Sequence, residues 1–228
     1  MSGEAFAGAE GVGVCYEALD AFGPEMLRAR ALGVELGIVV GGGNLVRGGR
    51  CGWQRFARLT ADRVGMVSTV VNGLLLGEWL AGHGMPSRVL TAIEMGQAVE
   101  AYSSDRALAY LEEGCVVIFV GGTGCPYFST DTAAALRAAE VGAGVLVKAT
   151  KVDGVFSADP MVNPDAVKYD RLTYGEAVGR DLRVMDHAAL SLCRENRIPI
   201  IVLDLNKEGN IVRALMGEPV GTIIREDE

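Results

Sequence analysis

A strand, a glycine-rich loop and a helix follow one another between residues 116 and 141, and they restrict the fold more than any other feature. The apolar run Val116-Val117-Ile118-Phe119-Val120 is typical of a buried parallel strand. The Ala and Leu positions of residues 132–141 predict a helix. Between them lies Gly121-Gly122-Thr123-Gly124-Cys125-Pro126-Tyr127-Phe128-Ser129-Thr130-Asp131-Thr132. In an open α/β sheet an anion binds at such a loop, because free backbone N–H groups and the helix dipole favour negative charge.

The polar residues at the end of this loop indicate phosphate chemistry. We expect Thr130 to cap the helix and Asp131 to bring a carboxylate beside the bound phosphates. A bare carboxylate would repel phosphate, so a cation or a basic side chain should lie close to it. This pairing points towards phosphoryl transfer.

A second loop of the same kind lies upstream. Residues 33–40 predict another apolar strand, and Gly41-Gly42-Gly43-Asn44-Leu45-Val46-Arg47-Gly48 follows it. Three glycines allow close backbone approach to a bulky anion, and Arg47 offers a planar bidentate donor. The chain has no Gly-Lys-Ser/Thr step, and its glycines do not fit a dinucleotide fingerprint. One such turn could be a tight connection only, whereas two with Arg and Asp attached favour phosphate binding.

The remaining elements alternate, which predicts an α/β fold: a three-layer αβα sandwich with a mainly parallel sheet and helices on both faces. No internal repeat or long linker divides the 228 residues, so we expect a single domain over residues 1–228. The expected helices are residues 22–32, 61–80, 104–113, 132–141, 174–178, 186–196 and 210–216. The expected strands are residues 33–40, 87–91, 116–120, 144–149 and 198–203, with residues 221–224 as an edge strand.

Composition predicts a cytoplasmic enzyme. Charged residues interrupt the apolar runs, so we expect no transmembrane span and no signal peptide. A net charge of −8 argues against a nucleic-acid partner, because no basic stripe is available to replace counterions. The cysteines have no metal-ligand spacing and are expected to be free thiols. They are Cys15, Cys51, Cys115, Cys125 and Cys193, of which Cys115 and Cys193 fall in apolar elements and should be buried.

Three motifs together resemble the bacterial uridylate (UMP) kinases of the amino-acid-kinase superfamily. They are the two loops described above and Lys148-Ala149-Thr150-Lys151-Val152-Asp153-Gly154-Val155-Phe156-Ser157-Ala158-Asp159-Pro160. The resemblance implies the amino-acid-kinase fold and ATP-dependent phosphorylation of UMP to UDP in pyrimidine nucleotide biosynthesis. It also implies Mg²⁺ bound with ATP, allosteric control by GTP, and a homo-hexamer built from dimers. In-line transfer to an ionised phosphate needs no general base, so catalysis reduces to positioning and charge neutralisation.

The resemblance also implies roles for individual residues. The catalytic set is Asp131, Asp186 and Arg47, and the two aspartates would orient lysines and Mg²⁺ without ligating a metal directly. The ATP set is Ser2, Gly3, Gly43, Arg47, Thr150, Phe156 and Asp159. The UMP set is Gly42, Asp62, Thr123, Gly124, Cys125, Pro126, Tyr127, Phe128, Ser129 and Thr130, with Asp62 on the ribose hydroxyls. Gly8, Ala9, Glu10, Gly11, Val12 and Gly13 resemble the segment involved in GTP regulation, although a flexible loop would have the same composition.

The chain departs from the family pattern at two places. Cys125 stands where the family commonly has Asn, and a thiol is a poor hydrogen-bond partner, so a side-chain contact to the base is expected to be lost. In the family a lysine on a first strand precedes the Ser-Gly-Glu found here at Ser2, so we expect an N-terminal truncation that removes this strand and its lysine. The hypothesis is a truncated gene model of an active enzyme. The alternatives are a non-catalytic nucleotide sensor or storage protein of the same fold, or a sister kinase acting on a carboxylate or carbamate.

Overall fold

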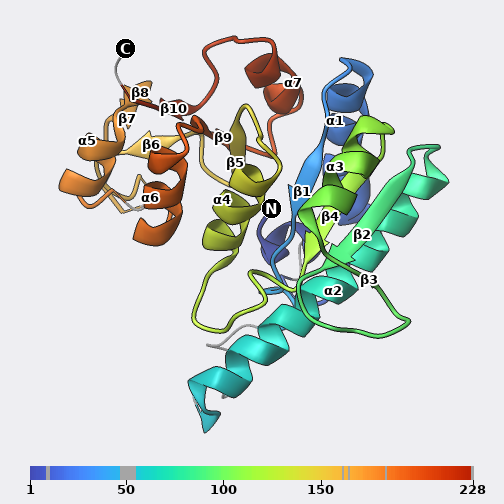
Figure 1. The fold of residues 1–228 in the computed structure, drawn as a ribbon. Coiled ribbons are helices and arrows are strands. Elements are labelled where there is room, and N and C mark those ends of the chain that lie inside the picture. The colour runs from blue at the N-terminus through green and yellow to red at the C-terminus, as the bar shows by residue number, and fades with distance from the viewer. Residues whose placement is uncertain (9–10, 47–54, 161, 164, 183, 227–228) are drawn as a thin grey trace. The chain divides into compact units, whose positions relative to one another are not determined.

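The computed structural model describes residues 1–8, 11–46, 55–160, 162–163, 165–182 and 184–226 (Figure 1). The chain divides into two compact units. Unit 1 is Met1–Ala133 and unit 2 is Ala134–Glu228. Each unit is described on its own below.

Unit 1 contains a four-stranded parallel sheet in the order β1-β4-β2-β3. Its strands are β1 (Gly37–Val39), β4 (Val116–Val120), β2 (Ser87–Thr91) and β3 (Glu100–Ala101). The central strand β4 is buried along its whole length, as its unbroken apolar sequence predicts for a strand covered on both faces. Its register aligns Ile118 with Ile38 of β1 and with Val89 of β2. Both glycine-rich loops therefore leave the carboxyl ends of adjacent strands.

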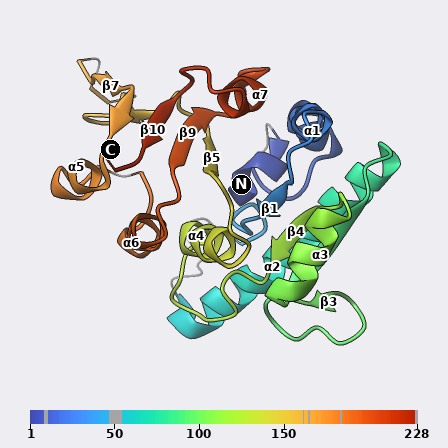
Figure 2. The same ribbon diagram turned by 45° about the horizontal axis from the view of Figure 1, so that its top comes forward.

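A 3-10 helix and three α-helices accompany this sheet: η1 (Gly3–Phe6), α1 (Tyr16–Ala31), α2 (Arg58–Gly82) and α3 (Ser104–Glu112). Helix α2 packs on β2 and β4, and Figures 1 and 2 show it as the long helix that runs past these strands. Gly73 permits this approach, because a Cβ there would lie 2.3 Å from Cγ1 of Val120. The side chain of Ser103 caps α3, accepting a hydrogen bond from the Arg106 N–H.

Helix α4 (Thr130–Glu140) begins in unit 1 and ends in unit 2. Unit 2 has a four-stranded sheet in the order β5-β9-β10-β8 and the antiparallel pair β6-β7. The strands are β5 (Leu146–Thr150), β9 (Ile200–Asp204), β10 (Thr222–Ile224), β8 (Arg171–Leu172), β6 (Val155–Phe156) and β7 (Lys168–Tyr169). The helices are α5 (Tyr174–Gly179), α6 (His187–Glu195) and α7 (Asn210–Leu215).

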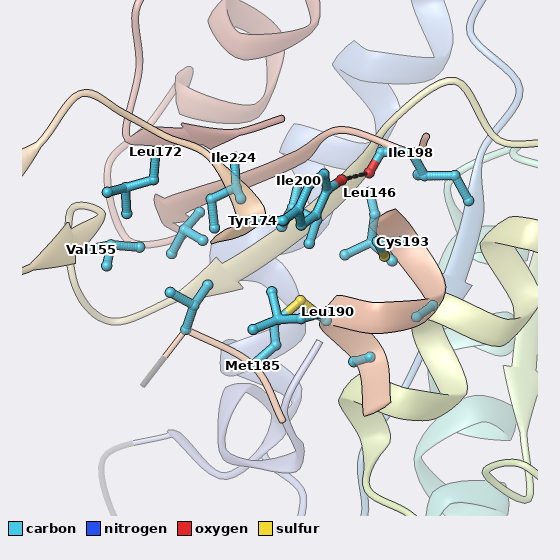
Figure 3. Close-up of a cluster of buried hydrophobic side chains, with 14 of the residues drawn as sticks. Leu146, Val155, Leu172, Tyr174, Met185, Leu190, Cys193, Ile198, Ile200 and Ile224 are labelled. Atoms are coloured by element: carbon cyan, nitrogen blue, oxygen red, sulfur yellow. Dashed lines mark hydrogen bonds between the residues drawn. The ribbon is translucent and has the colours of Figure 1, made fainter. Parts of the chain in front are cut away.

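An apolar cluster of buried residues lies at the core of unit 2 (Figure 3). Tyr174 is 2% exposed in this cluster, and its hydroxyl donates a hydrogen bond to the carbonyl of Ile198. Burial raises the pKa of the Tyr174 phenol well above its ordinary value, so the hydroxyl stays a donor at neutral pH. Burial likewise raises the pKa of the Cys193 thiol to about 11, which makes this cysteine an inert core residue.

Mainly parallel strands with helices confirm the predicted α/β class, and most elements lie within two or three residues of their predicted bounds. Three local predictions are wrong. Strand β10 is an inner strand between β9 and β8, antiparallel to β9, rather than an edge strand. Helix α1 begins at Tyr16 instead of residue 22 and continues through Pro24, because Leu19, Phe22 and Met26 bury an apolar face. Thr130 is already inside α4, and the Ser129 hydroxyl caps the helix instead.

Helix α2 is the segment that bears on the expectation of no transmembrane span. By length and apolarity alone this 25-residue helix could cross a bilayer, with a mean hydropathy of 1.4 over its most apolar 18-residue window. Half of that window is buried within the protein, where α2 covers the sheet of unit 1. A helix packed in this way passes the same length test without entering a membrane, so the match is weak support for a membrane location.

Candidate functional site

Unit 1 contains a pocket of about 430 Å³, within the range of small-molecule sites. Three segments form it: the first glycine loop, the N-terminal half of α2, and the second glycine loop up to the start of α4. The lining residues are Gly42, Gly43, Val46, Arg58, Ala61, Asp62, Gly65, Met66, Thr69, Gly122, Thr123, Cys125, Pro126, Phe128, Ser129 and Thr130. The two loops that the sequence singles out thus converge on one cavity.

The first glycine loop is pressed against neighbouring backbone at Gly41 and Gly42, where a side chain would not fit. A Cβ on Gly42 would lie 2.6 Å from the carbonyl oxygen of Gly65 and 2.7 Å from Cβ of Ser68, both on α2. A Cβ on Gly3 would lie 2.4 Å from the backbone nitrogen of Gly43. Any larger residue at Gly42 or Gly3 would therefore push the loop away from α2 or η1.

Asp62 ties α2 to the second glycine loop. Its carboxylate accepts hydrogen bonds from Nε of Arg58, 2.8 Å from each oxygen, and from the backbone N–H of Tyr127 at 2.8 Å. Tyr127 has a φ of 72°, a left-handed conformation that is costly for an aromatic residue and that the bond to Asp62 helps to hold. The Arg58 guanidinium also lies 5.5 Å from the centre of the Tyr127 ring.

The second glycine loop is held mainly by its own hydroxyl groups. The Thr123 hydroxyl donates to the carbonyl of Cys125 at 3.0 Å and accepts from its N–H at 3.1 Å, which fixes the backbone there without using the thiol. The Ser129 hydroxyl accepts from the N–H groups of Asp131 and Thr132, at 3.0 and 3.2 Å. Thr130, the first residue of α4, lines the pocket, so the N-terminal end of this helix and its dipole form part of the pocket wall.

Most of the residues expected to bind UMP surround this pocket. Eight of the ten line it: Gly42, Asp62, Thr123, Cys125, Pro126, Phe128, Ser129 and Thr130. Gly124 and Tyr127 belong to the same loop but do not line the cavity. Tyr127 is 64% exposed, and within unit 1 its backbone N–H donates to Asp62 while its ring lies near the Arg58 guanidinium.

The residues expected to bind ATP are divided between the units. Ser2 and Gly3 begin η1 beside Gly43 in unit 1. Thr150, Phe156 and Asp159 lie in unit 2, at the end of β5, in β6 and in the turn that follows. The Thr150 hydroxyl bonds to the carbonyl and the N–H of Val152, at 2.8 and 3.0 Å. Thr150 thus shapes the start of the loop that leads to Phe156.

The expected catalytic residues are likewise not assembled in one unit. Asp131 is in the first turn of α4 in unit 1, whereas Asp186 caps α6 in unit 2, where its carboxylate accepts from the Ala189 N–H at 2.9 Å. Arg47 lies outside the described residues. Of the segment expected to bind GTP, Gly8, Gly11 and Gly13 all have positive φ and Val12 is half-exposed, while Ala9 and Glu10 also fall outside the described residues.

Sequence reasoning missed the part of α2 that forms the pocket wall. Arg58, Ala61, Gly65, Met66 and Thr69 all line the cavity with Asp62. The signal was available for four of them, because Arg58, Gly65, Met66 and Thr69 lie three, four or seven positions from Asp62 and so share its face of a helix, whereas Ala61 directly precedes it. Gly65 is an open position on this wall, since no atom lies within 4 Å of a Cβ built there. Its missing side chain leaves the cavity open at this point.

Among the described residues, no group of three His, Cys, Asp or Glu side chains could hold a metal ion. In the described part of unit 2, two lysines surround Asp153, whose carboxylate lies 2.9 Å from Nζ of Lys207 and 3.4 Å from Nζ of Lys168. The hydrogen bond from Lys207 lowers the pKa of Asp153 below its ordinary value. Both lysines thus pair with the carboxylate of Asp153 in the loop between β5 and β6.

A model of the amino acid kinase family matches residues 2–204. The chain belongs to the amino acid kinase family. Its structure is similar to the UMP kinase of Bacillus anthracis, with a TM-score of 0.96 and 36% identity, covering 100% of this chain and 94% of that one. It is also similar to the UMP kinase of Ureaplasma parvum, with a TM-score of 0.92, 33% identity, and coverage of 99% and 96%. It is also similar to the uridylate kinase of Archaeoglobus fulgidus, with a TM-score of 0.71 and 29% identity, covering 92% of this chain and 93% of that one.

These matches confirm the resemblance that the three sequence motifs indicate. Within the amino acid kinase family, the likeness to UMP kinases extends over the whole chain at more than 30% identity for two of the structures. The αβα fold class is confirmed by the same comparison.

Proposed function

We propose that this protein transfers the γ-phosphoryl group of ATP to UMP, and that UMP occupies the pocket of unit 1. The observation that carries the proposal is the cavity between two glycine loops and α2, in a chain whose structure is similar to UMP kinases over its full length. A related kinase that phosphorylates a carboxylate would not need both Asp62 and the second glycine loop at the same cavity. The product would be UDP, in the cytoplasmic synthesis of pyrimidine nucleotides.

The proposed reaction joins two phosphates that repel each other. An ionised oxygen of UMP attacks the γ-phosphorus of ATP, the bond to the β,γ-bridging oxygen breaks, and ADP leaves, so no proton has to be removed. The protein must hold both phosphates and screen their charge. We assign the UMP phosphate to Gly42 and the start of α4, and the ATP phosphates to Gly3, Gly43 and Arg47.

Asp62 is proposed to bind the ribose hydroxyls of UMP, because a carboxylate can only accept from them. The hydrogen bonds from Arg58 and the Tyr127 N–H already orient it. Thr150, Phe156 and Asp159 of unit 2 are proposed to bind the adenosine part of ATP. Cys125 offers its backbone rather than its thiol, so selection of the base would rest on main-chain groups of the loop.

Mg²⁺ is proposed to enter with ATP rather than to occupy a resident site. The described residues supply no three-carboxylate or histidine cluster, so the phosphate oxygens would be its main ligands. When bound, the ion would neutralise charge on the transferred group. Asp131 and Asp186 would orient the surrounding cations, as the family resemblance implies.

We also propose that the protein is a homo-oligomer and that α2 forms the contact between two copies. Val67, Val71, Leu74 and Leu75 make an exposed apolar stripe on α2, each 41–44% exposed. Arg63 and Glu78 lie on the same face beyond its two ends, eight residues before and seven after Val71. An antiparallel pair of α2 helices centred there would place each arginine near the partner's glutamate, which favours a second copy over lipid. The hexamer implied by the resemblance would need further contacts.

Calorimetric titration of the protein with UMP and with 2′-deoxy-UMP tests the assignment of the pocket. We expect UMP to bind, 2′-deoxy-UMP to bind more weakly, and the difference between them to disappear in Asp62→Asn. A protein that binds the two uridine nucleotides equally well before the substitution would contradict the role assigned to Asp62. A protein that binds neither would contradict the assignment of the pocket.

A further inference from the structure

Two buried asparagines join three segments of unit 1, and neither belongs to the residues assigned above to a nucleotide. We propose that Asn44 and Asn72 are positioning residues for the first glycine loop. Their paired amides fix the peptide between Gly41 and Gly42 and fasten the turn at Gly13 to the same loop. The effect on turnover rests on the proposed function, whereas the effect on the loop does not.

The two side chains form a closed set of hydrogen bonds. Asn44 Nδ2 donates to Asn72 Oδ1 at 3.0 Å, and Asn72 Nδ2 donates back to Asn44 Oδ1 at 2.7 Å. The second N–H of Asn72 reaches the carbonyl of Gly41 at 2.7 Å, and that of Asn44 reaches the carbonyl of Gly13 at 2.7 Å. All four amide N–H groups therefore have an acceptor, at side chains that are 1% and 0% exposed.

This arrangement sets the direction of the next backbone N–H. In a trans peptide the N–H points opposite to the carbonyl, so the bond from Asn72 to Gly41 turns the Gly42 N–H away from Asn72. Among the residues that the structure describes, the N–H groups of Gly42 and Gly43 donate to no other protein group. Both residues line the pocket, so these donors stay available to an anion.

The turn at Gly13 is held to the loop by two bonds at once. Beside the side-chain bond from Asn44, the Gly13 N–H donates to the Asn44 carbonyl at 3.0 Å. Gly13 itself has a φ of 81°, which suits glycine and lets the chain turn there. A displacement of the loop on removal of either amide would therefore reach the turn as well.

Asn72 also belongs to a polar face of α2 that anchors the other glycine loop. Thr69, one turn earlier, accepts a hydrogen bond from the Gly121 N–H at 2.7 Å. The helix thus holds the first loop through Asn72 and the second through Thr69. Leaving either buried group without its partner is costly, so the loops cannot slip along α2 without losing these bonds.

The kinetic test compares Asn72→Ala and the double variant Asn44→Ala with Asn72→Ala against Asn210→Ala. Asn210 is a matched control, since its buried amide donates to the Asp204 carbonyl at 3.1 Å in unit 2 and is assigned no ligand. At a temperature where circular dichroism shows every variant folded, kcat/KM for UMP should fall about tenfold to a hundredfold in both Asn72 variants, as misplacement of about 1 Å can cause. The control should stay within about twofold of the original protein. The double variant leaves no side-chain amide unpaired and removes donors only from the Gly41 and Gly13 carbonyls, so it provides a second test if the single variant does not fold.

A second test does not depend on catalysis. Amide exchange followed by NMR reports the backbone bonds of the loop and the turn: Gly13 to Asn44, Gly41 to Met1, and Leu45 and Val46 to Gly42. These amides should exchange at least about tenfold faster in both Asn72 variants and be unchanged in Asn210→Ala. If these amides exchange in the Asn72 variants as they do in the original protein, the positioning role is wrong. If the original protein phosphorylates UMP and the Asn72 variants keep its kcat/KM, the positioning role is wrong as well. If the original protein does not phosphorylate UMP but the exchange result holds, the proposed function fails and the positioning role stands.

Discussion

Gly65 offers a test in which stability and substrate binding should change in opposite directions. It lies in the middle of α2, where glycine is less favourable than alanine by about 1 kcal/mol. A Cβ there meets no atom within 4 Å, so Gly65→Ala should gain that amount, or about 2–4 °C in Tm for a chain of this size. The gain requires only that the added methyl group enter the empty cavity.

With UMP bound, the same methyl group would occupy space that the ligand needs. Overpacking by one methyl group costs about 1–3 kcal/mol, which corresponds to about a fivefold to 150-fold rise in Kd. Thermal unfolding and calorimetric titration with UMP measure the two effects on one sample. Gly82→Ala is the control, since Gly82 also belongs to α2 and has no atom within 4 Å of a Cβ, but does not line the pocket.

The control should gain stability, by a smaller amount because it ends the helix, and bind UMP as the original protein does. If Gly65→Ala is more stable and still binds UMP equally well, the ligand does not contact this wall of α2. If Gly65→Ala is less stable, the space beside Gly65 is not open, and the reasoning from the structure fails.

Three further predictions concern separate parts of the chain. Thr69→Val should leave the buried Gly121 N–H without an acceptor and cost about 1–3 kcal/mol of unfolding free energy, measured by urea denaturation; Thr69→Ser should cost much less. Leu74→Asp should weaken self-association by about a hundredfold or more, measured by light scattering over a concentration series, and an unchanged molar mass at every concentration would contradict the α2 contact. The lowered pKa of Asp153 stabilises the fold above the ordinary value of 3.8 and loses that contribution as pH falls through the folded pKa. Lys207→Ala should reduce the loss of unfolding free energy between neutral and acid pH, measured by urea denaturation over a pH series. An unchanged pH dependence would show that the ion pair between Lys207 and Asp153 does not cause this loss.

The sequence predicts the strongly patterned elements well, because a buried strand leaves an unbroken apolar run and an amphipathic helix leaves a clear apolar period. Strands β2 and β4 have the predicted bounds, and α3 begins at the predicted residue, Ser104. The short strands β3, β6, β7 and β8 have two residues each and no period to recognise. The inner position of β10 depends on pairing with β8 and β9, which are distant in sequence, so local pattern could not give it.

The candidate site was predictable where the chain carries chemistry in consecutive residues, as in the two glycine loops. It was not predictable where packing creates the function. Gly65 is informative only because its neighbours leave an opening, and Asn44 and Asn72 are informative only because folding brings their amides together. A single sequence contains these residues but not the distances that give them a role.

The most direct test of the account is the rate of ADP release from Mg·ATP in the presence of UMP, CMP, GMP or no acceptor. We predict release that depends on UMP, is far slower with CMP and GMP, and falls to background without an acceptor. Equal release with all acceptors, or none from folded protein that binds UMP, would contradict the assignment of this chain as a UMP kinase.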